Sequence, residues 1–103
     1  MSFFLCSGML CTKKYFQVSV KVRINDDLKR TVELCRCVEK AGATFITVHG
    51  RTPAQRNEKP NYEAIKLVKS SLSIPVIANG NIKSYSQALE VAKFTGVDGR
   101  FLF

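Results

Sequence analysis

The feature that most constrains this sequence is a regular alternation of strand-like and helix-like segments between residues 17 and 99. Each strand-like segment is short and rich in β-branched residues, and each is followed by a stretch with apolar residues at helical spacing. One strand and one helix together take roughly 25 to 30 residues, which is typical of the β-α-β units of a parallel sheet. The sequence therefore predicts an α/β protein with parallel strands in the order β-α-β-α-β-α-β.

The first unit begins with a strand over residues 18–24. Four aliphatic residues alternate there with polar ones, and this period of two is typical of a strand with one buried face. Lys21 and Arg23 share the opposite face, which therefore meets either water or a ligand. The segment Asn25-Asp26-Asp27 offers N-cap candidates and negative charge at a helix start, and apolar residues continue at helical spacing up to Gly42, a natural stop.

The later units follow the same plan. Residues 44–49 and 74–78 are predicted strands, and the second is apolar enough to be buried on both faces of a parallel sheet. A helix is predicted over residues 62–72, and Ser84 with Gln87 forms a capping box that opens a third helix. The segment 96–99 then leads into a last apolar strand at 101–103.

Two folds fit this order: a doubly wound sheet and a (β/α)8 barrel. A complete barrel takes about 250 residues, so four units amount to about half of one. In both folds, ligands bind at the carboxyl ends of the strands. The candidate site residues are therefore those that end each strand, which are Lys21 with Arg23, then His49-Gly50-Arg51, then Asn79-Gly80-Asn81.

Each strand end allows a functional and a structural interpretation. Lys21 either points into a barrel mouth, where its ammonium can bind an anionic or carbonyl-rich ring, or lies solvated on an edge strand. His49, the single histidine, is followed by a glycine and by Arg51, a combination that favours a ligand over a purely structural role.

The turn after the third strand is also open to two interpretations. Asn79-Gly80 forms either a tight turn with positive φ or a set of backbone amides that hold a phosphate near a helix N-terminus. A phosphate site needs a second loop with free amides nearby, and residues 96–99 are the natural candidate for that loop. The sequence has neither a dinucleotide-binding fingerprint nor a P-loop.

Charge and cysteine content narrow the class of protein further. A net charge of +8 suits a surface that meets phosphate, in a nucleic acid or in a cofactor. The four cysteines show no C-x-x-C spacing, so no metal site is expected. Cys35 and Cys37 are predicted to lie on a helix as buried free thiols. No membrane span is expected, and a cytoplasmic protein fits, with the nucleus or the mitochondrion as alternatives.

Four ordered motifs give a family resemblance over about residues 17 to 99, with spacing that is more specific than any one motif. They are Val20-Lys-Val-Arg23, Ile46-Thr-Val-His-Gly-Arg-Thr52, Ile74-Pro-Val-Ile-Ala-Asn-Gly-Asn-Ile82 and Thr95-Gly-Val-Asp-Gly99. The chain resembles the tRNA-dihydrouridine synthases, and their eukaryotic branch looks most similar. The resemblance implies the later part of an FMN-binding TIM barrel, in which NADPH reduces FMN and the flavin reduces uridine in tRNA.

The resemblance also assigns roles to residues. Lys21 is similar to the lysine at the flavin ring, and His49 to the histidine beside the flavin and the substrate. Arg51 is similar to the arginine that borders the uridine pocket. The segment Asn79, Gly80 and Asn81 resembles an Asn-Gly-Asp loop at the FMN phosphate, with Asn81 in place of the aspartate.

Two departures from the family pattern lead to the expectation of an inactive fragment. The family's general-acid cysteine lies in an Asn-x-Gly-Cys-Pro motif that residues 1–16 lack, and neither Cys6 nor Cys11 is assigned that role. Residues 100–103 also differ from the family's last strand. The expected division is a divergent segment at 1–16 and a partial FMN-binding barrel at 17–103.

Two alternatives remain at this point. One is another FMN- or phosphate-binding barrel, similar to dihydroorotate dehydrogenase. The other is a basic RNA-binding fragment without catalysis, whose tRNA binding would depend on salt and not on flavin. The sequence leaves the oligomeric state open.

Overall fold

We describe the fold from a computed structural model of the chain. The structure describes residues 2–7, 16–55 and 57–100, with the backbone alone at residues 2–7 and 16. Its elements are β1 (Ser2–Ser7), β2 (Phe16–Arg23), α1 (Leu28–Lys40), β3 (Phe45–His49), α2 (Tyr62–Ser71), β4 (Val76–Asn79), α3 (Tyr85–Thr95) and β5 (Gly99–Arg100).

The strands form one sheet in the order β1-β2-β3-β4-β5. Strands β2 to β5 are parallel, as predicted, whereas β1 pairs with β2 in the antiparallel direction. The sequence pattern did not predict β1, and this strand is the exception to the expected parallel sheet. The predicted last strand at 101–103 lies outside the described residues, and the structure has a short strand just before it.

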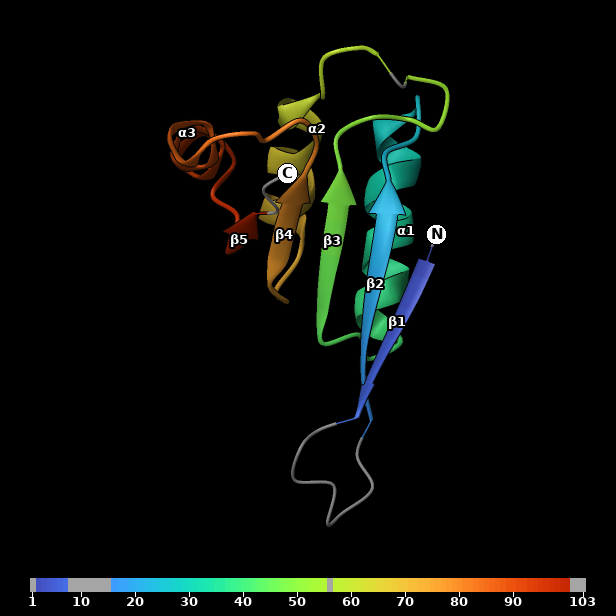
Figure 1. The fold of residues 1–103 in the computed structure, drawn as a ribbon. Coiled ribbons are helices and arrows are strands. Elements are labelled where there is room, and N and C mark those ends of the chain that lie inside the picture. Colours follow the sequence, from blue (N-terminus) through green and yellow to red (C-terminus); the bar gives the residue numbers. More distant parts are fainter. Residues whose placement is uncertain (1, 8–15, 56, 101–103) are drawn as a thin grey trace.

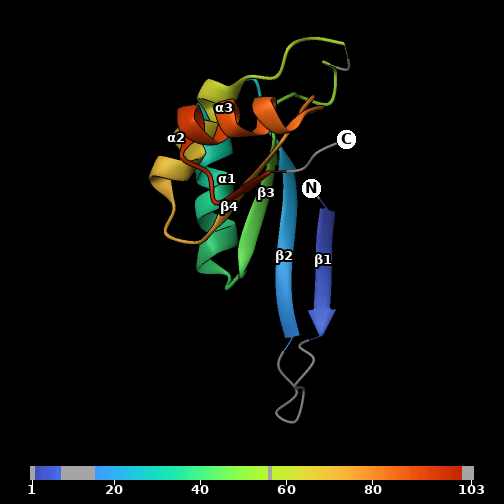
Figure 2. The same ribbon diagram turned by 60° about the vertical axis from the view of Figure 1, so that its left-hand side comes forward.

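The three helices lie on one face of the sheet (Figures 1 and 2). A doubly wound sheet carries helices on both faces, whereas a barrel keeps them on its outside with sequential strands side by side. The strand order β2-β3-β4-β5 together with the single helical layer is therefore the arrangement of a partial barrel.

The core lies between this helical layer and the sheet. Aliphatic side chains from matched positions of neighbouring strands face the helices, because Val20 pairs with Ile46 and Ile46 pairs with Val76. The buried core includes Val22, Val48, Ala78, Cys35, Val38, Ile65, Val68, Ala88 and Val91. Burial raises the pKa of the Cys35 thiol to about 11, so Cys35 is an inert core residue.

One detail of the cysteine prediction is wrong. Cys37 lies on α1 as predicted, but it is exposed. Residues two apart on a helix point in directions about 200° apart, so Cys35 and Cys37 cannot both face the core.

Two carboxylates close the amino end of the sheet. Glu39 Oε2, in the last turn of α1, accepts hydrogen bonds from the amides of Ser73 at 2.5 Å and Ile74 at 3.0 Å. Asp98 Oδ2 accepts from the amide of Val76 at 3.0 Å and from Lys69 Nζ at 2.6 Å. These contacts hold the start of β4 between α1, α2 and the segment that precedes β5.

Candidate ligand site at the carboxyl edge of the sheet

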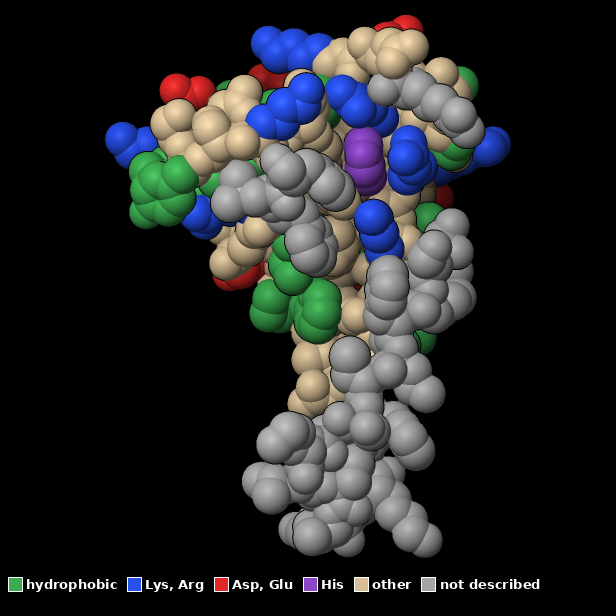
Figure 3. Space-filling model, viewed as in Figure 1, with side chains coloured by type: hydrophobic (Ala, Val, Ile, Leu, Met, Phe, Trp, Pro, Cys, Tyr) green, Lys and Arg blue, Asp and Glu red, His purple; other side chains and the backbone are tan. Residues whose placement is uncertain are grey.

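The strand register brings the predicted site residues to one edge of the sheet. Arg23 of β2 is the partner of His49 in β3, and His49 is the partner of Asn79 in β4. Lys21 lies two residues earlier in β2, on the same face as Arg23, and this face is opposite the helices. In Figure 3, Lys and Arg side chains surround the single histidine on this face of the molecule.

The cations at this edge lack acidic partners. Within residues 17–55 and 57–100, the two ion pairs are Arg30 with Asp27 and Lys69 with Asp98. Lys21, Arg23 and Arg51 therefore have no carboxylate partner in that part of the chain. Unpaired cations grouped at one edge create a positive potential that favours an anionic or electron-rich ligand.

His49 is buried, with 8% of its surface exposed, and carries no charge at neutral pH. Burial, followed by the charges of Arg23, Arg51 and Lys21, lowers the pKa of His49 from 6.5 to about 4. Its Nδ1 accepts a hydrogen bond from the Arg51 amide at 3.2 Å. The proton of the neutral ring therefore lies on Nε2, which makes Nε2 a donor for a ligand.

The two arginines at this edge bind backbone carbonyls of the loop between β3 and α2. Arg51 Nε donates to the carbonyl of Glu58 at 2.6 Å, and an Arg23 guanidinium nitrogen donates to the carbonyl of Thr52 at 3.3 Å. The loop arches over the carboxyl ends of β2 and β3 (Figure 1). Both arginines thus hold the loop while their remaining N–H groups stay available.

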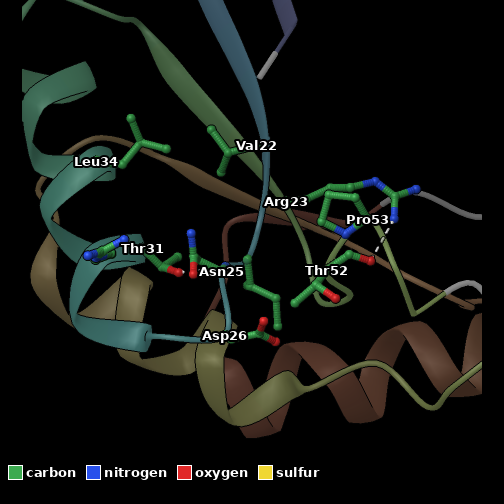
Figure 4. Close-up of a pocket in the computed structure, with 10 residues that line it drawn as sticks. Val22, Arg23, Asn25, Asp26, Thr31, Leu34, Thr52 and Pro53 are labelled. Carbon is green, nitrogen blue, oxygen red and sulfur yellow. Dashed lines mark hydrogen bonds between the residues drawn. The ribbon is translucent and has the colours of Figure 1, made fainter.

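The Arg23 contact also borders a cavity of about 280 Å³ between the end of β2, the start of α1 and the loop after β3. Figure 4 shows Val22 and Leu34 on one side of this cavity and Asp26 on another, with Arg23 reaching Thr52. The cavity lies at the carboxyl edge of the sheet, on the side of the helices. The sequence pattern does not predict this cavity, because its wall comes from two segments that are far apart in the sequence.

The turn after β4 packs closely against the end of β3. The Gly50 amide donates to the Asn79 carbonyl at 3.0 Å, and the Asn61 amide donates to the Gly50 carbonyl at 2.6 Å. A Cβ added at Gly50 or at Gly80 would lie 3.1 Å from Pro60 Cβ. Gly80 has a φ of +137°, so this turn requires a glycine both for its backbone conformation and for space.

Asn79 supplies a polar atom without a partner. Asn79 is 2% exposed, and its buried Oδ1 has no hydrogen-bond partner among the described residues. A buried acceptor left unpaired costs about 1 to 3 kcal/mol. Such an atom at the edge of a ligand face fits a site that receives a donor from a bound molecule.

The structure does not bring every predicted residue to this face. Lys21, His49, Arg51 and Asn79 lie together, whereas Asn81 is exposed and lines a separate cavity of about 350 Å³ beside α2 and α3. Asn81 adopts a φ of 54°, which an asparagine tolerates.

The prediction that residues 96–99 form the second phosphate loop is wrong. Gly96 is the C-cap of α3, and the Asp98 amide donates to the carbonyl of Val76, at the start of β4. A loop that runs from a helix to a strand in this fold returns to the amino edge of the sheet. The segment therefore lies at the edge opposite the turn at 79–81.

Neither of two other site types is found in the described residues. No group of three or more His, Cys, Asp and Glu side chains could hold a metal ion there. No helix among them is long and apolar enough to cross a membrane.

Comparison with known proteins assigns the chain to a family. The sequence model of the dihydrouridine synthase family matches residues 10–101. A human protein named tRNA-dihydrouridine(20a/20b) synthase (NAD(P)+)-like is 54% identical over 84 residues, which cover 82% of this chain and 26% of the human protein. The tRNA-dihydrouridine(20a/20b) synthase (NAD(P)+) of Saccharomyces cerevisiae is 41% identical, over 92% of this chain and 28% of its own length.

The chain belongs to the dihydrouridine synthase family, and it spans about a quarter of the length of these relatives. The relatives are named as enzymes that make dihydrouridine in tRNA. The match decides against the alternative of a barrel similar to dihydroorotate dehydrogenase.

Solved structures agree with the partial barrel. A structure titled as a mandelate oxidase mutant with a monooxide FMN adduct has a TM-score of 0.63 and 25% identity, and the match covers 80% of this chain and 29% of the oxidase. A second mandelate oxidase structure, at 24% identity and a TM-score of 0.61, shows the same fold.

Proposed function

We propose that the carboxyl edge of this sheet binds FMN and that the chain acts as part of a tRNA-dihydrouridine synthase. The observation that carries the proposal is the face formed by Lys21, His49 and Asn79, where, among the described residues, cations lack acidic partners and a buried acceptor lacks a donor. The family match and the FMN adduct named in the mandelate oxidase structure support the choice of this cofactor.

The residues present fit a flavin. The Lys21 ammonium and the Nε2–H of His49 can donate to the carbonyl-rich edge of the ring, and Asn79 Oδ1 can accept from an N–H or a hydroxyl of the same molecule. A positive potential also favours a ring that carries negative charge. FMN, when bound and reduced by NADPH, would supply the electrons that saturate the C5–C6 bond of a uridine.

The phosphate of FMN would lie at the turn 79–81. The turn leads into α3, whose N-terminal amides favour an anion. Because residues 96–99 lie at the opposite edge, the described chain supplies one phosphate-binding loop rather than two.

We propose tRNA as the substrate because the names of the relatives state it and because the chain carries a net charge of +8. Arg51 and Lys59 lie on the loop over the carboxyl edge, where they can contact RNA phosphates; Arg56 of the same loop lies outside the described residues. The 103 residues alone are not expected to reduce uridine, because they span about a quarter of the relatives. The cytoplasmic location and the division at residue 16 stay predictions.

The test is a fluorescence titration of FMN with the purified chain and its Lys21→Met variant. We expect saturable binding that Lys21→Met weakens about tenfold, since one charge-assisted contact is worth about 1.4 kcal/mol. Lys40→Met is the matched control, because Lys40 is exposed in the last turn of α1, at the amino edge. Circular dichroism checks that each variant folds. No saturable binding by the folded wild-type chain would contradict the proposal.

The second candidate, an RNA-binding fragment without flavin, is favoured by the charge alone. It predicts tRNA binding that weakens steeply with salt and does not change when FMN is added. Arg51→Ala combined with Lys59→Ala should weaken tRNA binding under either function. The flavin titration therefore separates the two candidates.

A further inference from the structure

Tyr62 connects the start of α2 to the turn after β4. Its hydroxyl donates a hydrogen bond to the Gly80 carbonyl at 2.5 Å, across 18 residues of sequence. The side chain is half-buried, and burial raises the pKa of Tyr62, so the hydroxyl keeps its proton and remains a donor. The charge of Arg51 acts in the opposite direction on the pKa of Tyr62, and burial outweighs it.

The contact fixes the orientation of one peptide plane. The Gly80 carbonyl and the Asn81 N–H belong to the same planar trans peptide and point in opposite directions. When Tyr62 holds the carbonyl toward α2, the Asn81 N–H points away from α2. No described residue accepts a hydrogen bond from this N–H.

Packing removes other freedom from the same turn. Pro60 is buried against both Gly50 and Gly80, with its Cβ 3.1 Å from the position that a Cβ would take at either glycine. Gly80 itself, with a φ of +137°, would otherwise have access to many backbone conformations. Pro60 restricts the position of the turn, and the Tyr62 hydroxyl sets the direction of its peptide.

We propose that Tyr62 is a positioning residue that orients the Gly80–Asn81 peptide so that its N–H faces a phosphate. This inference rests on the proposed function, namely that FMN binds with its phosphate at the turn. The consequence is a preference for FMN over riboflavin, which has the same ring and no phosphate. Tyr62 acts through the turn and makes no contact with the ring.

The experiment compares the Kd values of FMN and riboflavin for the wild-type chain and for Tyr62→Phe, by flavin fluorescence. We expect Tyr62→Phe to weaken FMN binding about tenfold and to leave riboflavin binding unchanged, because the hydroxyl affects the phosphate contact alone. A general loss of structure would weaken both ligands together. Ser70→Ala is the control, since Ser70 is exposed on α2 and its hydroxyl also donates to a backbone carbonyl, that of Leu67, away from the turn.

The outcomes separate this inference from the proposed function. If the wild-type chain binds FMN and Tyr62→Phe keeps the same preference for FMN over riboflavin, the role of Tyr62 is overturned and the cofactor site stands. An equal loss for both flavins also overturns it, because the residue would then be merely structural. If the folded wild-type chain binds neither flavin, the proposed function and this inference are both overturned.

Discussion

The two edges of β4 contrast in how their polar groups are satisfied. At the amino edge, Glu39 and Asp98 accept hydrogen bonds from the amides of Ser73, Ile74 and Val76. At the carboxyl edge, the cations have no acidic partners among the described residues, and the Asn79 acceptor is unpaired. One edge is complete within the chain, whereas the other has groups for a bound molecule to satisfy. The contacts at the amino edge therefore stabilise the fold, and we propose that the carboxyl edge binds the ligand, as is general in barrels.

The largest expected effect is the loss of Glu39. Glu39→Ala leaves two amides without a charged acceptor, so we expect the free energy of unfolding to fall by about 2 to 4 kcal/mol. Urea denaturation measures this change, and Glu33→Ala on the exposed face of α1 is the control. A loss equal to that of the control would remove the distinction between the two edges.

The next largest effect concerns His49, which makes the free energy of unfolding depend on pH. Its pKa is lowered from 6.5 to about 4 in the folded chain, so the unfolded chain binds the proton more readily. The stability linked to this residue is therefore present above pH 6.5 and is lost as the pH falls toward 4. We expect a contribution on the order of 2 kcal/mol across this window. Urea melts of wild type and His49→Gln, each as a function of pH, isolate this slope; equal slopes would contradict it.

Asp98 should contribute less to the free energy of unfolding, because its side chain is 46% exposed. Hydrogen bonds from Lys69 and from the Val76 amide lower its pKa. Its stabilising contribution is therefore present above its unfolded pKa of 3.8 and is lost as the pH falls through the lower folded value. Asp98→Asn should lower the free energy of unfolding by about 1 kcal/mol or less at pH 7. Thermal melts at pH 7 and pH 2 test this, since the difference should shrink in acid.

The smallest expected change in stability is that of a Lys21 substitution, and it has the opposite sign: the variant should be as stable as the wild type or slightly more stable. Removing its charge relieves repulsion from Arg23 and Arg51, so Lys21→Met should leave stability unchanged or raise it by about 0.5 kcal/mol. The same change should raise the pKa of His49, because the Lys21 charge contributes to lowering it. An NMR titration of the imidazole measures that shift. A destabilised variant would place Lys21 among the structural residues.

The sequence predicted the repeating units and the residues that end each strand, because both follow from periodicity and from the polarity of parallel strands. It misplaced the segment 96–99, since a pair of glycines does not reveal which edge of the sheet a loop meets. Glu39 and Tyr62 could not be predicted to bind backbone groups 34 to 35 and 18 residues away, because such contacts depend on packing. Strand β1 was missed, although it pairs with the next strand along the chain, because Ser2–Ser7 is an apolar run without the alternation of polar and apolar residues that marks β2.

The most direct test of the division between the edges measures FMN affinity and unfolding free energy together in Glu39→Ala and Lys21→Met. We predict that Glu39→Ala loses stability and, under conditions where it stays folded, keeps the wild-type Kd for FMN. We predict that Lys21→Met keeps stability and weakens FMN binding about tenfold. If FMN affinity follows stability in both variants, or if Lys21→Met binds FMN as tightly as wild type, the assignment of the carboxyl edge as the cofactor site is contradicted.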